Sequence, residues 1–264
     1  MVADHWLTAL EGFDHGQSLF RYLGRDGAEA TLEHRTLRLA AFASMNDPRE
    51  ASSWRANDLT GCRNLRAVPP LTESALQAYV DRTLRRGARV ASFGRDRPPR
   101  PNARPTIFDR GWANSAMWDR YGDRHRGVCL VFDAETLGAE FSEASDTWVR
   151  ANSVSSFVDV EYHDAPLQVP LEGEFDHLDS LRTALGRLLN ARTIAALYGR
   201  KSTVWQHERE TRLVQVRFDP PELELDNPLY LDVPRSLKAI VLGTEFGDTT
   251  SVLRYLAQFD EPRP

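Results

Sequence analysis

The sequence of 264 residues contains few cysteines, very few lysines and no long apolar run. Cys62 and Cys129 are the only cysteines, and their wide separation argues against a disulfide framework or a zinc site and favours two reduced thiols. No apolar stretch reaches the roughly 18 residues that a membrane span requires. The N-terminal segment has acidic rather than basic character near its start, with Asp4, and lacks the apolar core of a signal peptide. We therefore expect a cytoplasmic protein that does not enter the membrane.

The common catalytic motifs are missing as well. The sequence has no GxxxxGK[ST], GxSxG, HExxH or GxGxxG, which argues against a P-loop enzyme or a Rossmann dehydrogenase. The histidines show no ligand spacing, so no metal site is predicted. They are His5, His15, His34, His125, His163, His177 and His207.

Charge is distributed unevenly along the chain, whose formal net charge is -5. Residues 82–126 contain 12 arginines and 4 aspartates, with no lysine or glutamate. This segment could hold a dinucleotide pyrophosphate or a nucleic acid, or its arginines could pair with the acidic remainder of the fold. We favour pairing. Almost every basic residue of the chain is arginine, which we attribute to composition.

Hydrophobic periodicity predicts a mixed order of strands and helices. Residues 94–105, rich in Pro, Gly and Arg, are predicted to form a surface loop. Because neither an internal repeat nor a clear linker is present, we predict a single α+β domain over residues 1–264. The expected strands are 18–24, 37–44, 88–93, 128–137, 155–164, 211–218, 229–233 and 238–243, and the expected helices are 27–36, 71–87 (capped by Thr72), 112–127, 175–201 and 250–259.

Two polar segments are candidates for a site. Pro48 disfavours helix at Asp47, so residues 46–48 predict a turn in which Asn46 and Asp47 either cap the backbone or face a ligand. Farther along the chain, Glu208 and Glu210 share one face if the strand begins that early.

That pair of carboxylates permits two interpretations. It is either a solvated strand edge neutralised by Arg209 and Arg212, or part of a site with Trp205 as an aromatic wall. We favour the site, with Glu210 as the more important carboxylate.

Five segments occur in the order FRYLG, ASMNDPRE, VASF, MWDRYGDRHRGVCLVFD and KSTVWQHERETRL. Together they resemble an uncharacterised bacterial family with a domain of unknown function, whose signature includes NDPxE, MWxxYxxxHxGVC and WxxExExR. The match lies within residues 18–243. Ala91 and Ser92 stand where the family more often has a Cys-Phe-Ser strand. This resemblance implies no chemistry.

A second resemblance is to the ADP-ribosyltransferase fold. The segment YGDRHRGVCLVFDAETL is similar to the helix-to-strand segment of RNA 2'-phosphotransferases. An arginine on an early strand, a serine on a middle strand and a late ExE are similar to the arrangement in arginine-directed toxins. The resemblance implies that Arg21 contacts the phosphates or ribose of NAD and that Ser92 or Ser44 braces the nicotinamide half. It also implies that Glu210 is the catalytic carboxylate, while Glu208 positions or deprotonates the acceptor.

The helix expected at 112–127 carries Trp118, Tyr121 and His125. These rings either pack the helix, which we favour, or form a stacking wall for nicotinamide or adenine. The full set of cofactor-binding candidates is Arg21, Tyr22, Ser44, Asn46, Asp47, Ser92, Trp118, Tyr121, His125, Trp205 and Arg212.

We therefore predict an ADP-ribosyltransferase-like enzyme that cleaves NAD and transfers ADP-ribose to a protein or nucleic acid, as an effector or an antiphage factor. Because nicotinamide leaves as a neutral molecule, one carboxylate near the developing cation suffices and no Ser-His-Asp triad is needed. Two alternatives remain open. One is a nucleic-acid-processing enzyme that uses residues 82–126, and the other is a non-catalytic sensor that binds a nucleotide or a partner protein.

Overall fold

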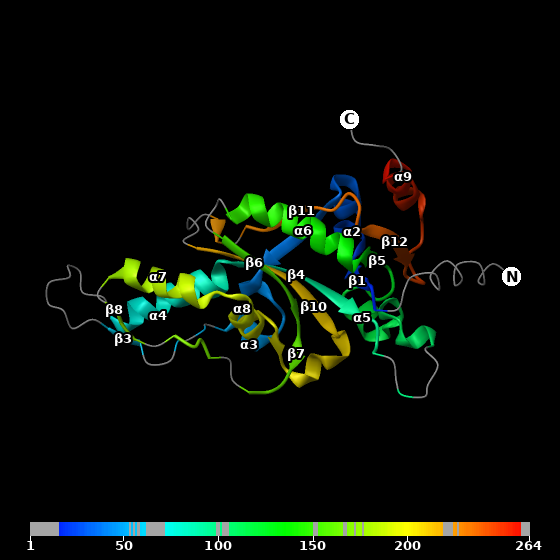
Figure 1. Cartoon of the computed structure of the whole chain (residues 1–264). Coiled ribbons are helices and arrows are strands. Elements are labelled where there is room, and N and C mark those ends of the chain that lie inside the picture. Colours follow the sequence, from blue (N-terminus) through cyan, green and yellow to red (C-terminus); the bar gives the residue numbers. More distant parts are fainter. Residues whose placement is uncertain are drawn as a thin grey trace.

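The computed structural model describes residues 16–52, 54, 56, 59–61, 72–98, 101, 106–149, 153–165, 168–171, 173–175, 177–218, 224–225 and 227–259. Its centre is an eight-stranded sheet in which every strand pairing is antiparallel (Figure 1). The strands are β1 (Ser18–Leu23), β2 (Thr36–Ala41), β4 (Ala88–Arg95), β5 (Val128–Asp133), β6 (Ser153–Asp159), β10 (Glu210–Arg217), β11 (Leu229–Asp232) and β12 (Leu237–Leu242).

Helices cover both faces of this sheet. One apolar cluster joins α4 (Glu73–Asp81), α7 (Leu178–Leu188) and α8 (Ala191–Tyr198) to β4, β6 and β10. A second cluster joins α2 (Arg25–His34), α6 (Ala134–Val149) and α9 (Thr250–Phe259) to the opposite face. A third, smaller cluster lies under α5 (Ser115–Arg120). This architecture confirms the predicted α+β class.

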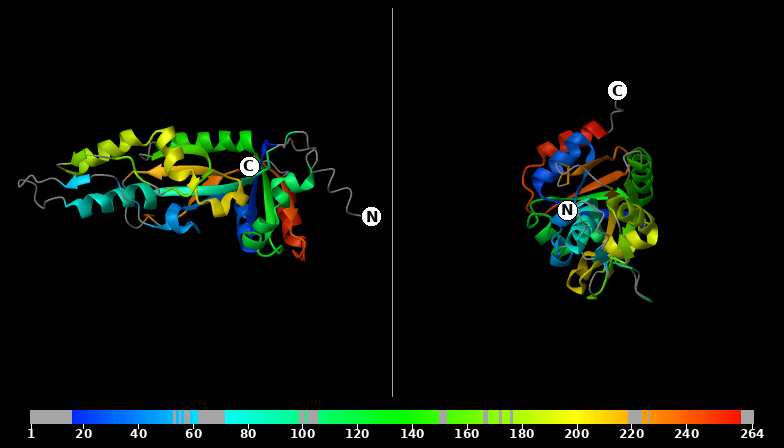
Figure 2. Two further views of the ribbon diagram at one scale, coloured as in Figure 1. Left: turned by 90° about the horizontal axis from the view of Figure 1, so that it is seen from below. Right: turned by 90° about the vertical axis from the view of Figure 1, so that its left-hand side faces the viewer.

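Short elements complete the chain. Two small parallel pairs are formed by β3 (Leu59–Gly61) with β8 (Gly173–Phe175), and by β7 (Glu161–Tyr162) with β9 (Arg200–Lys201). The molecule is elongated, and α4, α7, β3 and β8 form one end of it (Figure 2). The remaining elements are α3 (Pro48–Ala51), the 3-10 helices 42–44, 107–109, 111–113 and 203–208, and a π-helical extension of α4 over 82–86.

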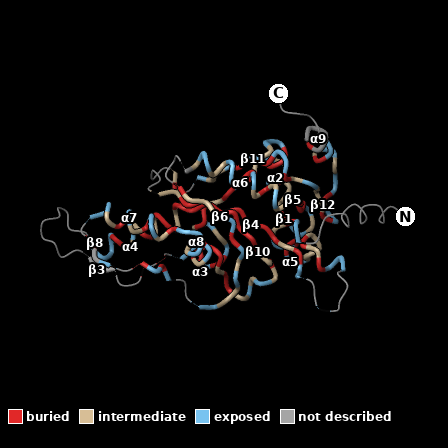
Figure 3. Tube along the Cα trace, viewed as in Figure 1, coloured by how far each residue is buried: buried red, intermediate tan, exposed pale blue. Residues whose placement is uncertain are grey.

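Side-chain alternation along β10 explains how the sheet separates the two main clusters. Val214 and Val216 face the cluster under α4, α7 and α8, whereas Leu213 faces the cluster under α2, α6 and α9. All three are fully buried, and burying each contributes about 1.5–3 kcal/mol. The buried trace follows these central strands (Figure 3). On the first face, the stripe of valines continues into Arg212 and Glu210, so the core becomes polar there.

One edge of β4 pairs with β10. The other edge pairs with two strands, β2 and β1, which diverge from each other. Arg89 and Val90 lie opposite β2, while Gly94 and Arg95 lie opposite β1. Residues 91–93 therefore face neither strand, and we call this opening the fork. A sheet that opens in this way leaves backbone polar groups that other donors must satisfy.

The structure corrects two predicted boundaries near the third cluster. The strand expected over 128–137 ends at Asp133, because its carboxylate accepts hydrogen bonds from the N–H and hydroxyl of Thr136 at 2.8 and 2.6 Å and so starts α6. The helix expected over 112–127 is only α5, because residues 123–125 all have positive φ angles and end the helical path before Gly127.

The expected helix over 175–201 is also divided. Asn190 accepts a hydrogen bond from the N–H of Thr193 at 3.1 Å and begins α8 as a new helix after α7. By contrast, the predicted cap at Thr72 is confirmed, since its hydroxyl accepts a hydrogen bond from the N–H of Ala75 at 3.1 Å. Within the part of the chain that the structure describes, no helix is both long and apolar enough to span a membrane.

Gly243 provides a test of the packing between β12 and the turn after α5. A Cβ atom at this position would lie 2.1 Å from the carbonyl oxygen of His125. We expect Gly243→Ala to lower the free energy of unfolding by about 1–3 kcal/mol, because the backbone must shift to admit the methyl group. The measurement is urea denaturation followed by circular dichroism.

The matched control is Gly138→Ala, in α6, where an added Cβ has no neighbouring atom within 4 Å. A methyl group there removes backbone freedom from the unfolded chain, and stability should rise by about 0.4–1 kcal/mol. Equal effects of the two substitutions would contradict this packing.

Candidate functional site

A cavity of about 260 Å³ opens beside the fork. Its walls come from β1, β2, β4, the turn after β2, the end of α5 and the segment that leads into β10. It lies between the cluster that contains Val90 and the aromatic cluster that contains Phe20 and Met117. Eight of the predicted site residues line it, namely Arg21, Tyr22, Ser44, Asn46, Ser92, Tyr121, Glu208 and Glu210.

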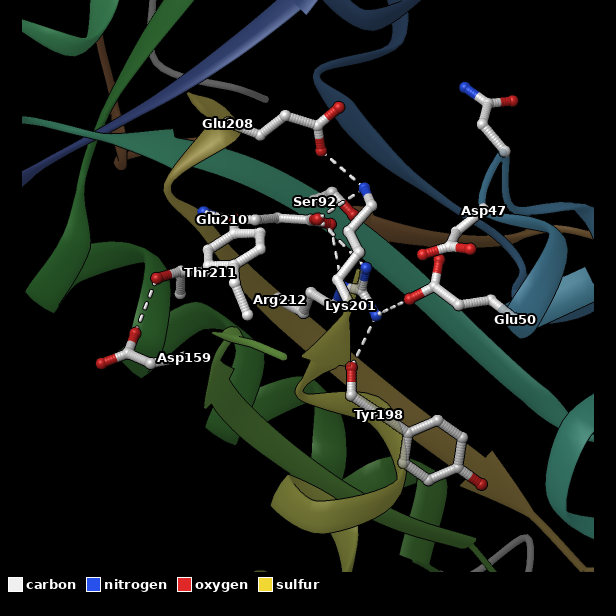
Figure 4. A network of polar contacts seen from close by, with 12 residues as sticks. Asp47, Glu50, Ser92, Asp159, Tyr198, Lys201, Glu208, Glu210, Thr211 and Arg212 are labelled. Carbon is white, nitrogen blue, oxygen red and sulfur yellow. Dashed lines mark hydrogen bonds and ion pairs between the residues drawn. The ribbon is translucent and has the colours of Figure 1, made fainter. Parts of the chain in front are cut away.

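The ammonium group of Lys201 links the two predicted carboxylates (Figure 4). Lys201 Nζ lies 2.5 Å from Glu208 Oε2 and 2.9 Å from Glu210 Oε2. All three side chains are only 3% exposed. A buried ammonium requires such anionic partners, because removing it from water costs several kcal/mol. Lys201 thus fixes the separation of the two glutamates.

Arg212 holds Glu210 from the other side. Its Nε lies 2.8 Å from Glu210 Oε1 and its Nη2 lies 3.0 Å from Oε2, which is a bidentate pair. Its Nη1 donates a hydrogen bond to the Tyr198 carbonyl at 2.6 Å and also lies 2.6 Å from Glu50 Oε1. The Arg212 side chain is fully buried. Two cations therefore hold Glu210, and Glu50 joins the cluster through Arg212.

This cluster contains three carboxylates and two cations, so one negative charge is in excess. Burial opposes ionisation of Glu210, but the charges of Arg212 and Lys201 outweigh it and lower its pKa well below the ordinary value. Burial raises the pKa of Glu50, and the single contact with Arg212 only partly offsets this. The pKa of Lys201 is raised because the two glutamates outweigh its burial. Glu210 is thus held ionised at neutral pH, and Glu50 takes a proton more readily than Glu210 does.

Glu208 reaches this cluster by a route that differs from the predicted one. The strand does not begin at Glu208, which ends the 3-10 helix over 203–208. Arg209 follows with a φ angle of 48°, and β10 starts at Glu210. A shared strand face was expected only if the strand began by residue 208, and this condition is not met. The left-handed residue between them turns both carboxylates toward Lys201.

The second oxygen of Glu208 faces the turn after β2. Glu208 Oε1 accepts a hydrogen bond from the Tyr121 hydroxyl at 2.8 Å, and that hydroxyl accepts one from Asn46 Nδ2 at 3.5 Å. Burial and the neighbouring Glu208 charge raise the pKa of Tyr121 to about 12, so it stays a donor near neutral pH. Glu208 is therefore held by one cation and one hydroxyl, more weakly than Glu210.

Arg21 crosses the fork. Its Nη1 donates a hydrogen bond to the Ser92 carbonyl at 3.3 Å and its Nη2 donates one to the Arg38 carbonyl at 3.0 Å, which ties β4 to β2. Burial and, to a lesser extent, the charge of Arg38 lower the pKa of Arg21, Glu210 partly offsets both, and the resulting pKa is about 10. Arg21 still remains a cation at neutral pH, in the same cavity as the carboxylates.

The hydroxyl groups of the site differ in their availability. The Ser92 Oγ is buried and has no hydrogen-bond partner within the described residues, although it helps to lower the pKa of Glu210. The Ser44 hydroxyl donates a hydrogen bond to the Ala41 carbonyl at 2.7 Å, and that of Tyr22 donates one to the Gly111 carbonyl at 2.5 Å. Of the two serines considered, Ser92 is the one whose hydroxyl is not bonded to a backbone carbonyl and acts on Glu210 instead.

Five predicted site residues do not line the cavity. Trp118 stacks on His125 with ring centroids 5.7 Å apart, and its Nε1 donates a hydrogen bond to the Trp112 carbonyl. The structure thus places these two rings in the packing of the turn after α5. Asp47 is a backbone cap, since its side chain accepts hydrogen bonds from the N–H groups of Arg49 and Ser202.

Trp205 and Arg212, the remaining two, lie next to the cavity without lining it. Lys201 Nζ lies 5.0 Å from the centre of the Trp205 ring, whose other contact is Arg120 at 4.3 Å. Trp205 thus contacts the ammonium from outside the cavity, whereas the sequence predicted it as an aromatic wall of the site itself. Arg212 acts on Glu210 from behind the site.

Lys201 and Glu50 were absent from the predicted site, although both lie within the quoted motifs KSTVWQHERETRL and ASMNDPRE. One sequence signal could have identified the lysine. The chain has only two lysines among 33 basic residues, so a lysine is a departure from its composition. Glu50 gives no such signal, because its contact with Arg212 depends on the fold.

The arginines of residues 82–126 are largely engaged within the protein. Arg85 pairs with Asp81 at 2.7 Å, and the Arg89 side chain donates hydrogen bonds to the carbonyls of residues 224, 225 and 227. The arginines are thus engaged within the protein, but with backbone carbonyls and with aspartates of the same segment as well as with the acidic remainder of the fold. Further ion pairs join Arg95 to Asp159, Arg97 to Asp109, Arg110 to Asp96, and Arg126 to Asp123.

The metal-ligating side chains and the cysteines lie as follows. Across the described residues, no group of three or more His, Cys, Asp and Glu side chains is placed to hold a metal ion. Cys129 is buried, and burial raises the pKa of its thiol well above the ordinary value, so it is unreactive. Cys62 lies outside the described residues.

Residues 117–213 match the model of a family described as "Protein of unknown function (DUF2971)". This segment includes Lys201, both carboxylates of the ExE pair and Arg212, but neither Arg21 nor Glu50. No curated protein and no solved structure matches the chain. The match supports the predicted resemblance to a family with a domain of unknown function. The relation to ADP-ribosyltransferases stays a prediction.

The excess negative charge makes a pH-dependent prediction for Glu50→Gln. Below about pH 4.5, the ordinary pKa of this carboxyl, Glu50 is protonated in both states and resembles the amide. Above that pH the unfolded chain releases its proton first, so the wild type should lose stability relative to Glu50→Gln. The expected slope is at most about 1.4 kcal/mol per pH unit until the folded carboxyl ionises as well. Denaturant unfolding at pH 4 to 8 measures it.

The control for this experiment is Glu135→Gln, an exposed acid in the first turn of α6. It removes an exposed carboxyl outside the buried cluster, so its stability difference from the wild type should not follow the pH dependence expected of Glu50→Gln. A stability difference for Glu50→Gln that does not change with pH would mean that the folded and unfolded carboxyls share one pKa, contrary to the charge count above.

Proposed function

We propose that the cavity beside the fork is the active site of an ADP-ribosyltransferase-like enzyme that cleaves NAD and transfers ADP-ribose to a macromolecular acceptor. The observation that carries this proposal is the meeting of Arg21, Ser92, Glu208 and Glu210, from separate segments of the chain, around one cavity. An arginine, a serine hydroxyl and two carboxylates supply a phosphate contact, a polar brace and anions beside the reacting carbon.

Glu210 suits the role of the catalytic carboxylate. When the bond between C1' of the ribose and the nicotinamide nitrogen breaks, its electron pair leaves with the nitrogen, and positive charge develops at the ribose. A carboxylate that Arg212 and Lys201 keep ionised would stabilise that charge without any reorganisation. The carboxylate need not gain or lose a proton in this step.

Glu208 suits the role of the acceptor base. The acceptor hydroxyl or amine forms a new bond to C1' and must release a proton. Glu208 is held only by Lys201 and Tyr121, so one of its oxygens could exchange the Tyr121 hydroxyl for the acceptor. Tyr121 and Lys201 are then positioning residues, which set the direction of the Glu208 carboxylate.

A second function, nucleotide sensing without catalysis, is favoured by one observation. Both carboxylates are only 3% exposed and already ion-paired, which is also the arrangement of a rigid binding site. The sensor would bind NAD or a related nucleotide and release no product. The same experiment separates the two.

The test is nicotinamide release from NAD by the purified protein, with and without cell extract as a source of acceptor. Glu210→Gln should slow the release by about 100- to 1000-fold, as for the loss of one preorganised electrostatic group. Glu208→Gln should reduce transfer to the acceptor more than hydrolysis of NAD. The control Glu135→Gln, on the opposite side of the sheet, should match the wild type.

Glu210→Gln leaves two buried cations with less charge to balance them, so its folding must be checked by thermal unfolding. Ser92→Ala offers an alternative, because the Ser92 hydroxyl has no hydrogen-bond partner among the described residues. It should raise the KM for NAD and leave the fold intact. NAD binding by calorimetry with no release would favour the sensor, and the absence of both would contradict NAD as the ligand.

A further inference from the structure

A second, larger cavity of about 650 Å³ lies next to the first. It is bounded by β1, α2, β2 and β11. Arg21 and Leu23 line both cavities, so the guanidinium that crosses the fork is their common wall. The other lining residues are Gly27, Ala30, Thr31, His34, Thr36, Arg38 and Tyr230.

This second cavity is positively charged. Arg21 and Arg38 line it, and none of its lining residues is acidic. Within the described part of the chain, neither guanidinium forms an ion pair with a carboxylate, and their proximity is part of what lowers the pKa of Arg21. Asp232 lies opposite Thr36 in the strand register but does not line the cavity. Two cations thus face a space without a counter-ion from the protein.

Hydrogen-bond donors also converge on this space. Arg21 uses one N–H each for the carbonyls of Ser92 and Arg38, which leaves three of its five N–H groups. Tyr230 lies directly opposite Arg38 in the pairing of β11 with β2 and is 56% exposed. Paired guanidinium groups and a hydroxyl match the oxygens of a phosphate.

We propose that this cavity is a binding subsite for the diphosphate group of a nucleotide, held by Arg21, Arg38 and Tyr230. The subsite extends the proposed function. Only the orientation of the bound nucleotide rests on that function. The diphosphate would lie at Arg38 and the glycosidic carbon beside Glu210, with Arg21 between them. A cavity of 260 Å³ alone is small for a dinucleotide, and the adjoining cavity of 650 Å³ supplies the additional space.

The test is isothermal titration calorimetry with inorganic pyrophosphate and with ADP as probes. Arg38 is exposed and its side chain makes no hydrogen bond within the described residues, so Arg38→Ala should fold normally. It should weaken the binding of both probes by about 10- to 100-fold, as for the loss of one charge-assisted hydrogen-bonding group. The matched control is Arg192→Ala, an exposed arginine in the first turn of α8.

The outcomes distinguish the sources of the phosphate and the two proposals. Tighter binding of ADP than of pyrophosphate identifies a nucleotide, whereas pyrophosphate as the better ligand would overturn the nucleotide assignment. No binding by the wild type, or equal weakening in Arg38→Ala and Arg192→Ala, would overturn the subsite. Probe binding that depends on Arg38 without nicotinamide release leaves the subsite standing and rejects the transferase. Nicotinamide release that is unchanged in Arg38→Ala would reject the subsite and leave the transferase standing.

Discussion

The buried ammonium of Lys201 is the interaction on which the site depends. It joins β9 to the end of a 3-10 helix and to the first residue of β10, and the next N–H, that of Ser202, donates a hydrogen bond to Asp47. Charges alternate from there through Glu210 and Arg212 to Glu50. Such a chain adds little net stability, since each buried ion must first lose its water. Its effect is to hold these side chains in one arrangement. The arrangement is strongly maintained, because removing one member would leave a buried charge without a partner.

The opening in the sheet determines where this charged cluster can meet a ligand. β1 and β2 each pair with only two residues of β4, so the sheet is continuous on the β10 side and divided on the other. Arg21 occupies the division and satisfies carbonyls of two strands with one side chain. Concave sites with a few convergent polar groups on a rigid scaffold are the usual form of small-molecule sites. The fork forms a cavity of this shape between regular strands.

The sequence predicted the regular parts of this architecture better than the interactions that join them. The alternation of β10 and the helical spacing of α2 and α9 are local properties, and both were found as expected. The meeting of Arg21 with the ExE pair was also expected, from a resemblance. The contact of Arg212 with Glu50 and the division of β4 between two strands depend on residues far apart in the chain. Local backbone geometry explains other failures, such as the left-handed residues after α5 and at Arg209.

The scarcity of lysine gives this protein a built-in reporter. Among the described residues there are two side-chain amines, and they lie in opposite environments: Lys238 is exposed on β12, while Lys201 is 3% exposed and its pKa is raised. An amine-selective acylating reagent therefore reacts with Lys238 in the native protein, and with Lys201 only when the ion pairs of Lys201 with Glu208 and Glu210 open. The acylation rate of this single position would measure how often the charged cluster opens, and a ligand in the cavity would change that rate.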